Sequence, residues 1–332
     1  MMAQNDRVVV GIDVAKDKVD ACIRSLSQEQ TFLSTAEGQR ALIRWLRKHK
    51  VGKVAMEASG GYERDWAKTL REAGIEVRIV DPKRVRSFAR SAGRLAKNDA
   101  IDAEMIAWFA ETFTDAPGQA YDAAREKLVQ IVNARQCLLD LQTGLQNRGE
   151  HSTPEVVQKM QARLLKTIAL EVAKLEAAIT AMIKVTPHFA ELAEIIERVP
   201  GLGKIASAGL IAAMPELGQV SDNIGAALLG VAPYDDDSGQ RRGGRHIKGG
   251  RRKVRNLFYM PCLGAATQHN PVLKAFYDRL IAKGKEPKVA LTACMRKLIV
   301  ILNTMIARRQ KWDANRYKVS DSARLPPSAC PA

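Results

Sequence analysis

Four acidic residues are spaced so that a fold could gather them around a divalent cation. Asp13 lies near the end of an apolar, β-branched run, RVVVGIDV, and Glu57 ends a second apolar run. Asp99 and Asp102 lie three positions apart in a segment of helical character, which places them on the same helical face. Crowded carboxylates repel one another unless a cation joins them, and Mg²⁺ prefers oxygen ligands. The pattern predicts a Mg²⁺ site, with Mn²⁺ as a substitute, that could support two-metal phosphoryl transfer.

Each carboxylate also has an ordinary structural explanation. Asp99 could cap a helix N-terminus, and Glu57 could be an exposed strand end. Asp13 is the hardest to explain in this way, because a buried charge without its partner costs roughly 3–5 kcal/mol. The other acidic residues nearby fit ordinary surface positions: Asp17, Asp20, Glu63, Asp65 and Glu104.

A serine far along the chain is a candidate nucleophile. Ser238 precedes Gly239 in a glycine-rich segment, GVAPYDDDSGQRRGGRHIKGG, that opens a basic run. A serine hydroxyl is a weak nucleophile unless a base or metal assists it and the phosphate is held in place, and arginines bind phosphate bidentately. By spacing alone, an ordinary Ser-Gly turn is the alternative. The three aspartates at 235–237 could be loop charges that pair with the arginines.

Positive charge is concentrated in two segments of the chain. The 332 residues include 52 Lys and Arg against 36 Asp and Glu, a net charge of +16. Residues 83–97 and 241–255 carry many basic residues and no acidic one. A single run of this kind could be a solvated face, but two favour phosphate binding, because each neutralised phosphate releases counterions. Nucleic acid is the favoured partner, ahead of an acidic membrane surface. The candidate nucleic-acid contacts in these runs are Lys83, Arg84, Arg86, Arg90, Arg94, Lys97, Arg241, Arg242, Arg245, Lys248, Arg251 and Arg252.

The composition excludes several classes of protein. With 46% hydrophobic and 27% charged residues, the chain is typical of a folded globular protein. No stretch approaches the roughly 18 consecutive apolar residues that span a bilayer, and the N-terminus lacks the apolar core of a signal peptide. Five scattered cysteines without a CxxC pair argue against a disulfide scaffold or a zinc ribbon. We therefore expect an intracellular protein without a membrane partner.

The N-terminal third is predicted to be an α/β domain. Three β-prone segments are followed by a helix at 37–49, a strand at 51–58, a helix at 62–73, a strand at 75–80 and a helix at 99–113. This order is that of an RNase H-like fold with a mixed five-stranded sheet flanked by helices. The basic segment that follows the last strand has no predicted helix or strand.

The remainder of the chain is predicted to be mainly helical. Heptad spacing before residue 146 and alternating steps of three and four between 165 and 182 indicate a coiled-coil hairpin, although two helices packed inside one domain could show the same pattern. Thr153 is the expected N-cap of the second helix, with Pro154 at its first position. Two later helices joined by Pro-Gly-Leu-Gly resemble a helix-hairpin-helix, in which Gly201 and Gly203 would expose amides to a phosphate. The predicted divisions are 1–116, 117–192, 193–320 and a disordered tail at 321–332.

Five motifs resemble, in order, those of the IS110-family transposases, including the IS1111 group: GIDVAKDKVD, MEASGGYE, KNDAIDAE, VPGLGKIASAGLIA and GVAPYDDDSG…GG…IKGGRRKVRNLFYM. The resemblance covers about residues 8 to 310. It implies a RuvC-like domain with an Asp-Glu-Asp-Asp set, a coiled coil and a C-terminal transposase domain with a catalytic serine. Carried over by motif, these residues are Asp13, Glu57, Asp99, Asp102 and Ser238.

The resemblance also implies a mechanism and partners. Such enzymes are DNA recombinases of insertion sequences in the bacterial cytoplasm, associated with the nucleoid, and a non-coding bridge RNA pairs with target and donor DNA. Ser238 would form a covalent phosphoserine link with Mg²⁺ assistance, in a composite site of a dimer or tetramer. Three alternatives stay open: a RuvC-like nuclease that uses metal-activated water, a DNA invertase of similar sequence, and a non-catalytic nucleic-acid scaffold.

Overall fold

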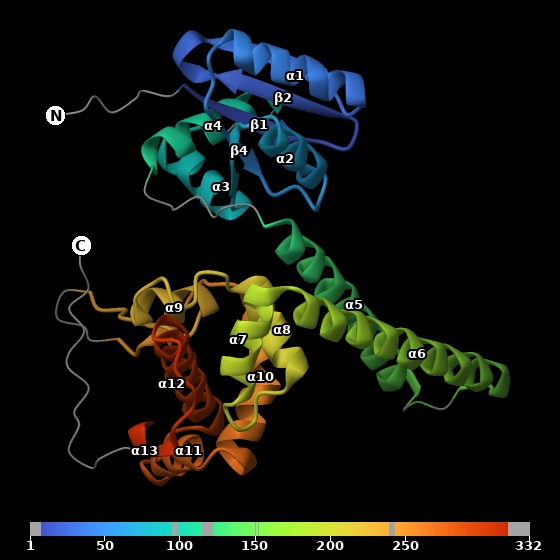
Figure 1. Ribbon diagram of the computed structural model, residues 1–332, viewed down its shortest axis with the longest axis vertical. Coiled ribbons are helices and arrows are strands. Elements are labelled where there is room, and N and C mark those ends of the chain that lie inside the picture. The colour runs from blue at the N-terminus through green and yellow to red at the C-terminus, as the bar shows by residue number, and fades with distance from the viewer. Residues whose placement is uncertain are drawn as a thin grey trace. The chain divides into compact units, whose positions relative to one another are not determined.

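The computed structural model describes residues 8–94, 99–114, 122–149, 151, 153–238 and 243–317, with the side chains of residues 99–101 left undescribed. It divides into two compact units, residues 1–121 and 122–332, which Figure 1 draws in blue to green and in green to red. Several predicted features lie outside the described residues: Lys97, Arg241, Arg242, the break at 115–120 and the tail at 321–332.

A mixed five-stranded sheet, in the order β3-β2-β1-β4-β5, forms the centre of the first unit. β1 (Val9–Val14) and β2 (Lys18–Ile23) are antiparallel, as are β2 and β3 (Gln28–Leu33). β4 (Lys53–Glu57) runs parallel to β1, and β5 (Glu76–Val80) runs parallel to β4. The predicted order of three strands, helix, strand, helix and strand is confirmed.

Two helices cover one face of this sheet. These are α1 (Ala36–Lys48) and α2 (Glu63–Glu72). Alternate side chains of a strand point to opposite faces of the sheet, and the apolar β1 side chains Val10 and Ile12 point to the face that these helices cover. Leu42 of α1 and other apolar side chains of α1 and α2 complete this core.

The opposite face carries α3 (Pro82–Ser91) and α4 (Asp99–Thr112), as Figure 1 shows. Ala55 and Val80 of the sheet pack with Met105 and other apolar residues of these helices. A short 3-10 turn, η1 (Arg24–Leu26), contacts α4.

No helix was expected in the basic segment after β5, but residues 82–91 form α3. The Asp81 side chain accepts a hydrogen bond from the backbone N–H of Lys83 at 2.7 Å, and Pro82 occupies the first helical turn. Val85 and Ala89, one turn apart, are buried against the sheet. These are ordinary start and packing signals for a helix, and the density of positive charge obscured them.

The second unit begins with two long helices that pack together as a hairpin, α5 (Ala123–Gly149) and α6 (Glu155–Val185) (Figure 1). The Arg135 side chain on α5 binds Glu176 on α6, with an Nε–Oε1 distance of 2.7 Å. α6 begins one residue later than expected, with Pro154 rather than Thr153 at the N-cap position. The coiled-coil assignment of this hairpin stays a prediction.

The rest of the second unit is mainly helical, as predicted. Its elements are α7 (Pro187–Glu197), α8 (Lys204–Ala213), α9 (Asp222–Leu229), β6 (Pro233–Tyr234), β7 (His246–Ile247), α10 (Arg252–Gly264), the π-helix η2 (Ala265–His269), α11 (Pro271–Ala282), α12 (Pro287–Ala307) and α13 (Ala314–Tyr317). α12 is long and apolar enough to cross a membrane by length and composition, but more than half of it is buried in this unit. It is therefore explained as a core helix of the second unit.

Candidate active site

Two of the predicted acidic residues lie side by side at the end of the central strands. β1 and β4 are parallel, with Ile12 opposite Met56, so Asp13 and Glu57 follow directly at the same level of the sheet. Both side chains are half-buried. By strand alternation they lie on the face that carries α3 and α4, because Ala55, two residues before Glu57, packs against those helices.

A glycine in β1 brings the third acidic residue to the same place. A Cβ atom at Gly11 would lie 2.1 Å from the carbonyl oxygen of Ala103 and 2.4 Å from the backbone nitrogen of Ala107. α4 therefore crosses β1 at a distance that only glycine permits. Asp102 precedes Ala103 on α4, and it is half-buried. Asp99 is the first residue of the same helix, but its side chain lies outside the described residues.

Asp13, Glu57 and Asp102 line one cavity of about 690 Å³, which we call the acid cavity. The structure thus brings together three of the four acidic residues predicted for a metal site, from β1, β4 and α4. The remaining polar wall of the cavity comes from α3, a helix missing from the sequence-based prediction: it supplies Lys83, Arg86, Ser87 and Arg90.

The donor chemistry of this cavity suits a hard divalent cation such as Mg²⁺, because all three acidic side chains offer carboxylate oxygens. Among the described side chains, however, no group of three or more His, Cys, Asp or Glu residues is spaced to hold a metal ion. The carboxylates share a cavity without forming a closed coordination shell. Asp13, Glu57 and Asp102 are the residues that would hold a cation.

Two acidic residues expected at the surface have defined roles. Glu63 is 9% exposed, and its Oε2 accepts hydrogen bonds from the backbone N–H groups of Ser59 at 3.0 Å and Gly61 at 2.9 Å. The expectation of an ordinary surface position was therefore wrong for Glu63, which organises the turn directly after Glu57. The sequence signal was an acidic residue in the first turn of a helix that follows Ser-Gly-Gly.

The second of these acidic residues is Asp20, which pairs in register with Asp13 across β1 and β2. The Asp20 carboxylate forms an ion pair with Lys18 at 2.9 Å and accepts a hydrogen bond from the Thr31 hydroxyl. Asp20 also lines a different hollow, together with Glu29. Asp20 is thus engaged on the β2–β3 side of the sheet and does not line the acid cavity.

Two other predicted contacts, Arg84 on α3 and Arg94 after it, do not line the cavity. The Arg84 guanidinium carbon lies 5.3 Å from the ring centre of Phe109 and 5.8 Å from that of Phe113, a cation–π arrangement. Arg94 is exposed just beyond the helix end. The basic residues of this one run therefore lie in different environments: some line the cavity and others lie beside aromatic rings or at the surface.

Ser238 belongs to the second unit and is exposed. It follows β6, in the segment that leads to β7, and the residues directly after it lie outside the described part. Of the three preceding aspartates, Asp235 pairs with an arginine as the sequence suggested, Arg245 at 2.5 Å. Asp236 pairs instead with Lys248 at 3.7 Å, and Asp237 accepts a hydrogen bond from the backbone N–H of Gly243 at 3.0 Å.

Two arginines of the second basic run contribute to the packing of the unit. Arg251 donates to the carbonyl of Ala213, at the end of α8, and to Oε2 of Glu216, at 2.7 and 2.8 Å. Arg255, absent from the predicted contacts, donates to the carbonyl of Gly230 at 2.8 Å. Arg252, at the first position of α10, is instead exposed.

The predicted Gly-x-Gly turn joins α7 and α8. Gly201 has φ +97°, and a Cβ there would lie 2.6 Å from the Cβ of Ala265, so glycine is needed for the turn and for packing. Gly203 is exposed at the N-cap of α8, with no atom near its missing Cβ. This part of the turn stays a candidate phosphate contact.

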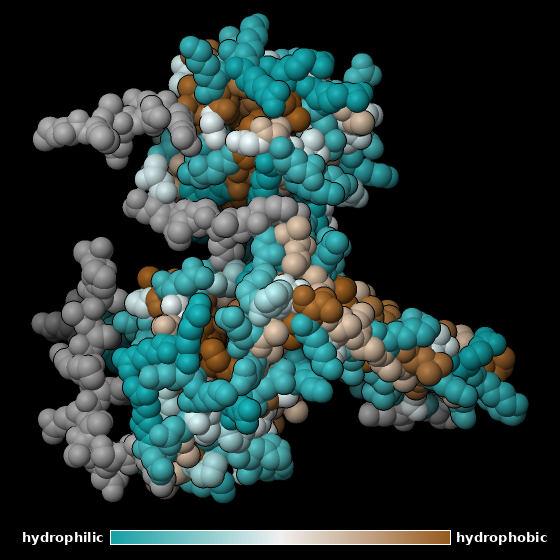
Figure 2. Space-filling view, in the orientation of Figure 1, coloured by the Kyte–Doolittle hydropathy of each residue, from teal (hydrophilic) through white to brown (hydrophobic). Residues whose placement is uncertain are grey.

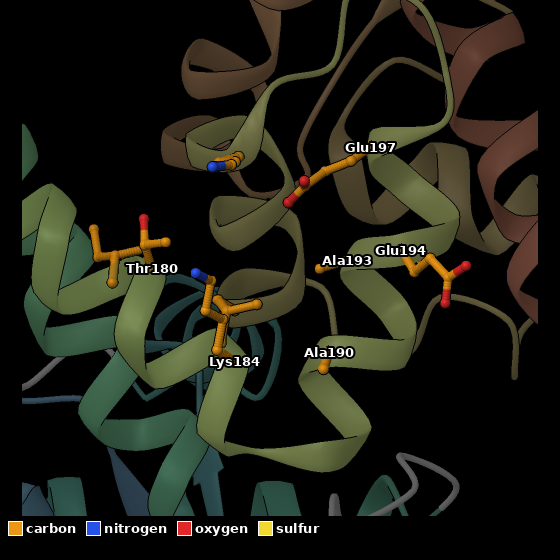
Figure 3. Close-up of a pocket in the computed structure, with 9 residues that line it drawn as sticks. Thr180, Lys184, Ala190, Ala193, Glu194 and Glu197 are labelled. Atoms are coloured by element: carbon orange, nitrogen blue, oxygen red, sulfur yellow. The ribbon is translucent and has the colours of Figure 1, made fainter.

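A second hollow, of about 230 Å³, lies between α6, α7 and α8. Figure 3 shows Lys184 and Glu197 pointing into it from α6 and α7, whereas Glu194 points away, toward the side on which it pairs with Lys311 at 2.7 Å. Its floor is mainly apolar, and it contains none of the predicted catalytic residues. The acid cavity of the first unit is therefore the better candidate for chemistry.

Family models of related transposases match both units of the chain. The family model DEDD_Tnp_IS110, described as a transposase, matches residues 10–151, and the model of the IS116/IS110/IS902 transposase family matches residues 193–278. The pilin gene-inverting protein of Moraxella bovis is 24% identical over 330 residues, which cover 92% of this chain and 98% of that protein. A probable family 20 transposase of Pseudomonas aeruginosa is 26% identical over 280 residues, covering 75% of this chain and 81% of that protein.

The first family model covers the three acidic residues of the cavity, and the second covers Ser238. The two matches occur in the order of the motifs, and they come from models of the same transposases. This chain therefore belongs to the IS110 family of transposases, the DNA recombinases of insertion sequences.

Proposed function

We propose that this transposase cuts and rejoins the DNA of an insertion sequence by a serine-dependent, metal-assisted phosphoryl transfer. The observation that carries the proposal is the single cavity that receives Asp13, Glu57 and Asp102 from three separate elements and that basic side chains of α3 also line. Carboxylates gathered beside cations suit a reaction in which charge develops on phosphate oxygens.

Asp13, Glu57 and Asp102 would hold Mg²⁺, or Mn²⁺ in its place, with Asp99 as a further ligand from the same helix as Asp102. The bound cation would stabilise charge on the phosphate and lower the pKa of an oxygen that binds it. The Ser238 Oγ would attack phosphorus, its proton would pass to a base or to solvent, and the displaced DNA oxygen would leave with a proton.

The sheet of the first unit supports an RNase H-like, RuvC-type assignment, because antiparallel β3-β2-β1 continues into parallel β1-β4-β5 beside the acidic residues. We further propose that a bridge RNA pairs with target and donor DNA. Arg245, Lys248, Arg252 and the α3 region then contribute basic surface.

Self-association through the α5–α6 hairpin, to a dimer or tetramer, completes the proposal. Figure 2 shows apolar side chains along this hairpin, and Leu141, Val156 and Leu170 are 54%, 74% and 57% exposed. Apolar residues at this density on the outside of a helical pair are typical of a surface that another protein covers. A second copy of the hairpin would bury them.

A DNA invertase is the second candidate, because the pilin gene-inverting protein aligns over 98% of its length. It would share the chemistry and differ in the arrangement of its DNA sites. A test substrate with the two ends of the element in direct or inverted orientation separates excision from inversion.

The mechanism is tested with Ser238→Ala and Asp102→Asn, with Ser25→Ala as a control on an exposed serine. The full-length protein is incubated with DNA from both ends of the element and with RNA transcribed from its flanks. We expect a protein–DNA adduct that survives denaturation in the wild type and in Ser25→Ala. It should be absent in the other two variants, although they still bind DNA. Cleavage by Ser238→Ala without an adduct would instead establish attack by water.

A further inference from the structure

The basic residues of α3 fall into two groups that the sequence does not distinguish. Lys83, Arg86 and Arg90 follow one another at steps of three and four, so they share one side of the helix, and all three line the acid cavity. Arg84 lies beside the rings of Phe109 and Phe113. Of these two groups, only the first lines the cavity together with the carboxylates.

We propose that Lys83, Arg86 and Arg90 form a clamp for the phosphodiester that is cut, and that they hold its non-bridging oxygens against the cation site. The inference rests on the proposed function, because it assigns the substrate group to that same cavity. It separates these residues from the general nucleic-acid surface of the protein and gives them a role in the chemical step.

The charge balance of the cavity supports a clamp. Three carboxylates line it, and a DNA phosphate that entered beside them alone would be repelled. Three basic side chains that line the same cavity offset this repulsion, so that the formal charges of the lining residues balance before a cation and a phosphate enter. Guanidinium groups also bind phosphate oxygens bidentately, which fixes the orientation of phosphorus.

The backbone N–H groups in the first turn of α3 are another potential phosphate-binding group near the cavity. The backbone N–H of Lys83, in the first turn, already donates to the Asp81 side chain at 2.7 Å. Phosphate binding by the helix terminus is therefore reduced, and the side chains carry the interaction. With about 690 Å³, the cavity lies within the range of about 300–1,000 Å³ that ligand pockets have.

Ser87 supplies a position from which the occupant can be identified. It lines the same cavity, one helical turn after Lys83 and just before Arg90. A cysteine at this position should therefore face the phosphate that is cut. Lys68 is exposed on α2, which covers the opposite face of the sheet, and it serves as the matched control position.

The first test measures binding and chemistry separately in the full-length protein, with element-end DNA and flank-derived RNA. We expect Arg86→Ala and Arg90→Ala to lower the cleavage rate at saturating DNA and Mg²⁺ by about 100-fold. The control Arg94→Ala removes the same charge at an exposed position four residues after Arg90 that does not line the cavity. Like the cavity variants, Arg94→Ala should weaken DNA binding and reduce the salt dependence of binding by about one counterion. Its cleavage rate at saturating DNA and Mg²⁺ should stay within about threefold of the wild-type rate.

Two results of this test would overturn the clamp. One is an equal effect of Arg86→Ala and Arg94→Ala on the saturated rate. Another is recovery of the Arg90→Ala rate simply by raising DNA concentration, which would indicate general binding. Arg90→Lys should recover part of the rate, because it restores charge without the bidentate geometry. A melting temperature equal to the wild type shows that each variant is folded.

The second test does not depend on activity. Ser87→Cys and Lys68→Cys are made in a Cys137→Ser, Cys330→Ser background, because Cys137 is an exposed free thiol and Cys330 lies outside the described residues. DNA that carries a thiol tether on the phosphate to be cut should form a disulfide with Ser87→Cys and not with Lys68→Cys. Equal crosslinking of both positions, or preferential crosslinking of Ser87→Cys to tethered RNA, would overturn the assignment.

The proposed function and the clamp fail in different ways. If Asp102→Asn cleaves DNA like the wild type, the metal-dependent function is wrong. If Asp102→Asn is inactive while Arg86→Ala and Arg90→Ala behave like Arg94→Ala, the function stands and the clamp is wrong.

Discussion

Replacing Gly11 with alanine should separate α4 from β1 and disturb the acid cavity. The added Cβ would lie 2.1 Å from the Ala103 carbonyl oxygen and 2.4 Å from the Ala107 nitrogen. Carbon–oxygen contacts of this kind ordinarily lie at about 3.3–3.6 Å, so α4 must move by about 1 Å. Asp102 is adjacent to Ala103 and would move with the helix, away from Asp13 on β1.

The expected cost follows from this displacement. Overpacking of a close contact costs about 1–3 kcal/mol, and 2 kcal/mol corresponds to a fall of about 10 °C in the melting temperature of a domain of this size. A misplacement of 1 Å at a catalytic site lowers the rate by about 100-fold. Gly11→Ala should therefore reduce Mg²⁺-dependent cleavage even at a temperature where the variant is fully folded.

Calorimetry and a cleavage assay on the same preparation test this reasoning. Gly144→Ala is the matched control, because no atom lies within 4 Å of the added Cβ on α5. That substitution should stabilise the helix by up to about 1 kcal/mol and leave cleavage unchanged. If Gly11→Ala melts and cleaves like the wild type, the close approach of α4 to β1 does not position Asp102.

Three further predictions concern polar contacts of buried or half-buried side chains. Glu63→Ala should destabilise the protein by about 2 kcal/mol, because two backbone N–H groups of the turn after β4 lose their acceptor, and Glu63→Gln should recover about half in a thermal melt. Asn303→Ala should cost about 3 kcal/mol in urea unfolding, since the buried Asn303 side chain bridges the turn before α9, and an unchanged midpoint would contradict this. Burial alone would raise the pKa of Asp122, but hydrogen bonds from the Arg125 backbone and the His188 side chain bring it below its usual value. The stability that Asp122 adds over Asp122→Asn should thus be complete at pH 6 and decline as the pH falls below about 4.

The strand ends and their acidic residues were predictable from sequence because buried strands leave a clear apolar pattern. A carboxylate at the end of such a run, as at Asp13 and Glu57, stands out against it. Asp102 was found through helical spacing. These signals are local in sequence, so they can be recognised without knowledge of the tertiary structure.

The parts that could not be predicted depend on contacts between distant segments. Gly11 appears unremarkable in sequence, and its role emerges only when α4 lies across β1. The different environments of Arg84, Arg86 and Arg251 depend in the same way on which rings, carboxylates or carbonyls the fold brings near. A charge run shows that phosphate binding is favourable, but not which of its members are already paired.

The central claim, a cation held by the acid cavity, is tested most directly by Mn²⁺ binding to the full-length protein, followed by electron paramagnetic resonance. Asp13→Asn and Asp102→Asn should each weaken binding at least about tenfold, whereas Asp65→Asn, an exposed carboxylate on α2, should bind like the wild type. If all three variants bind Mn²⁺ as tightly as the wild type, the cation site does not lie in this cavity.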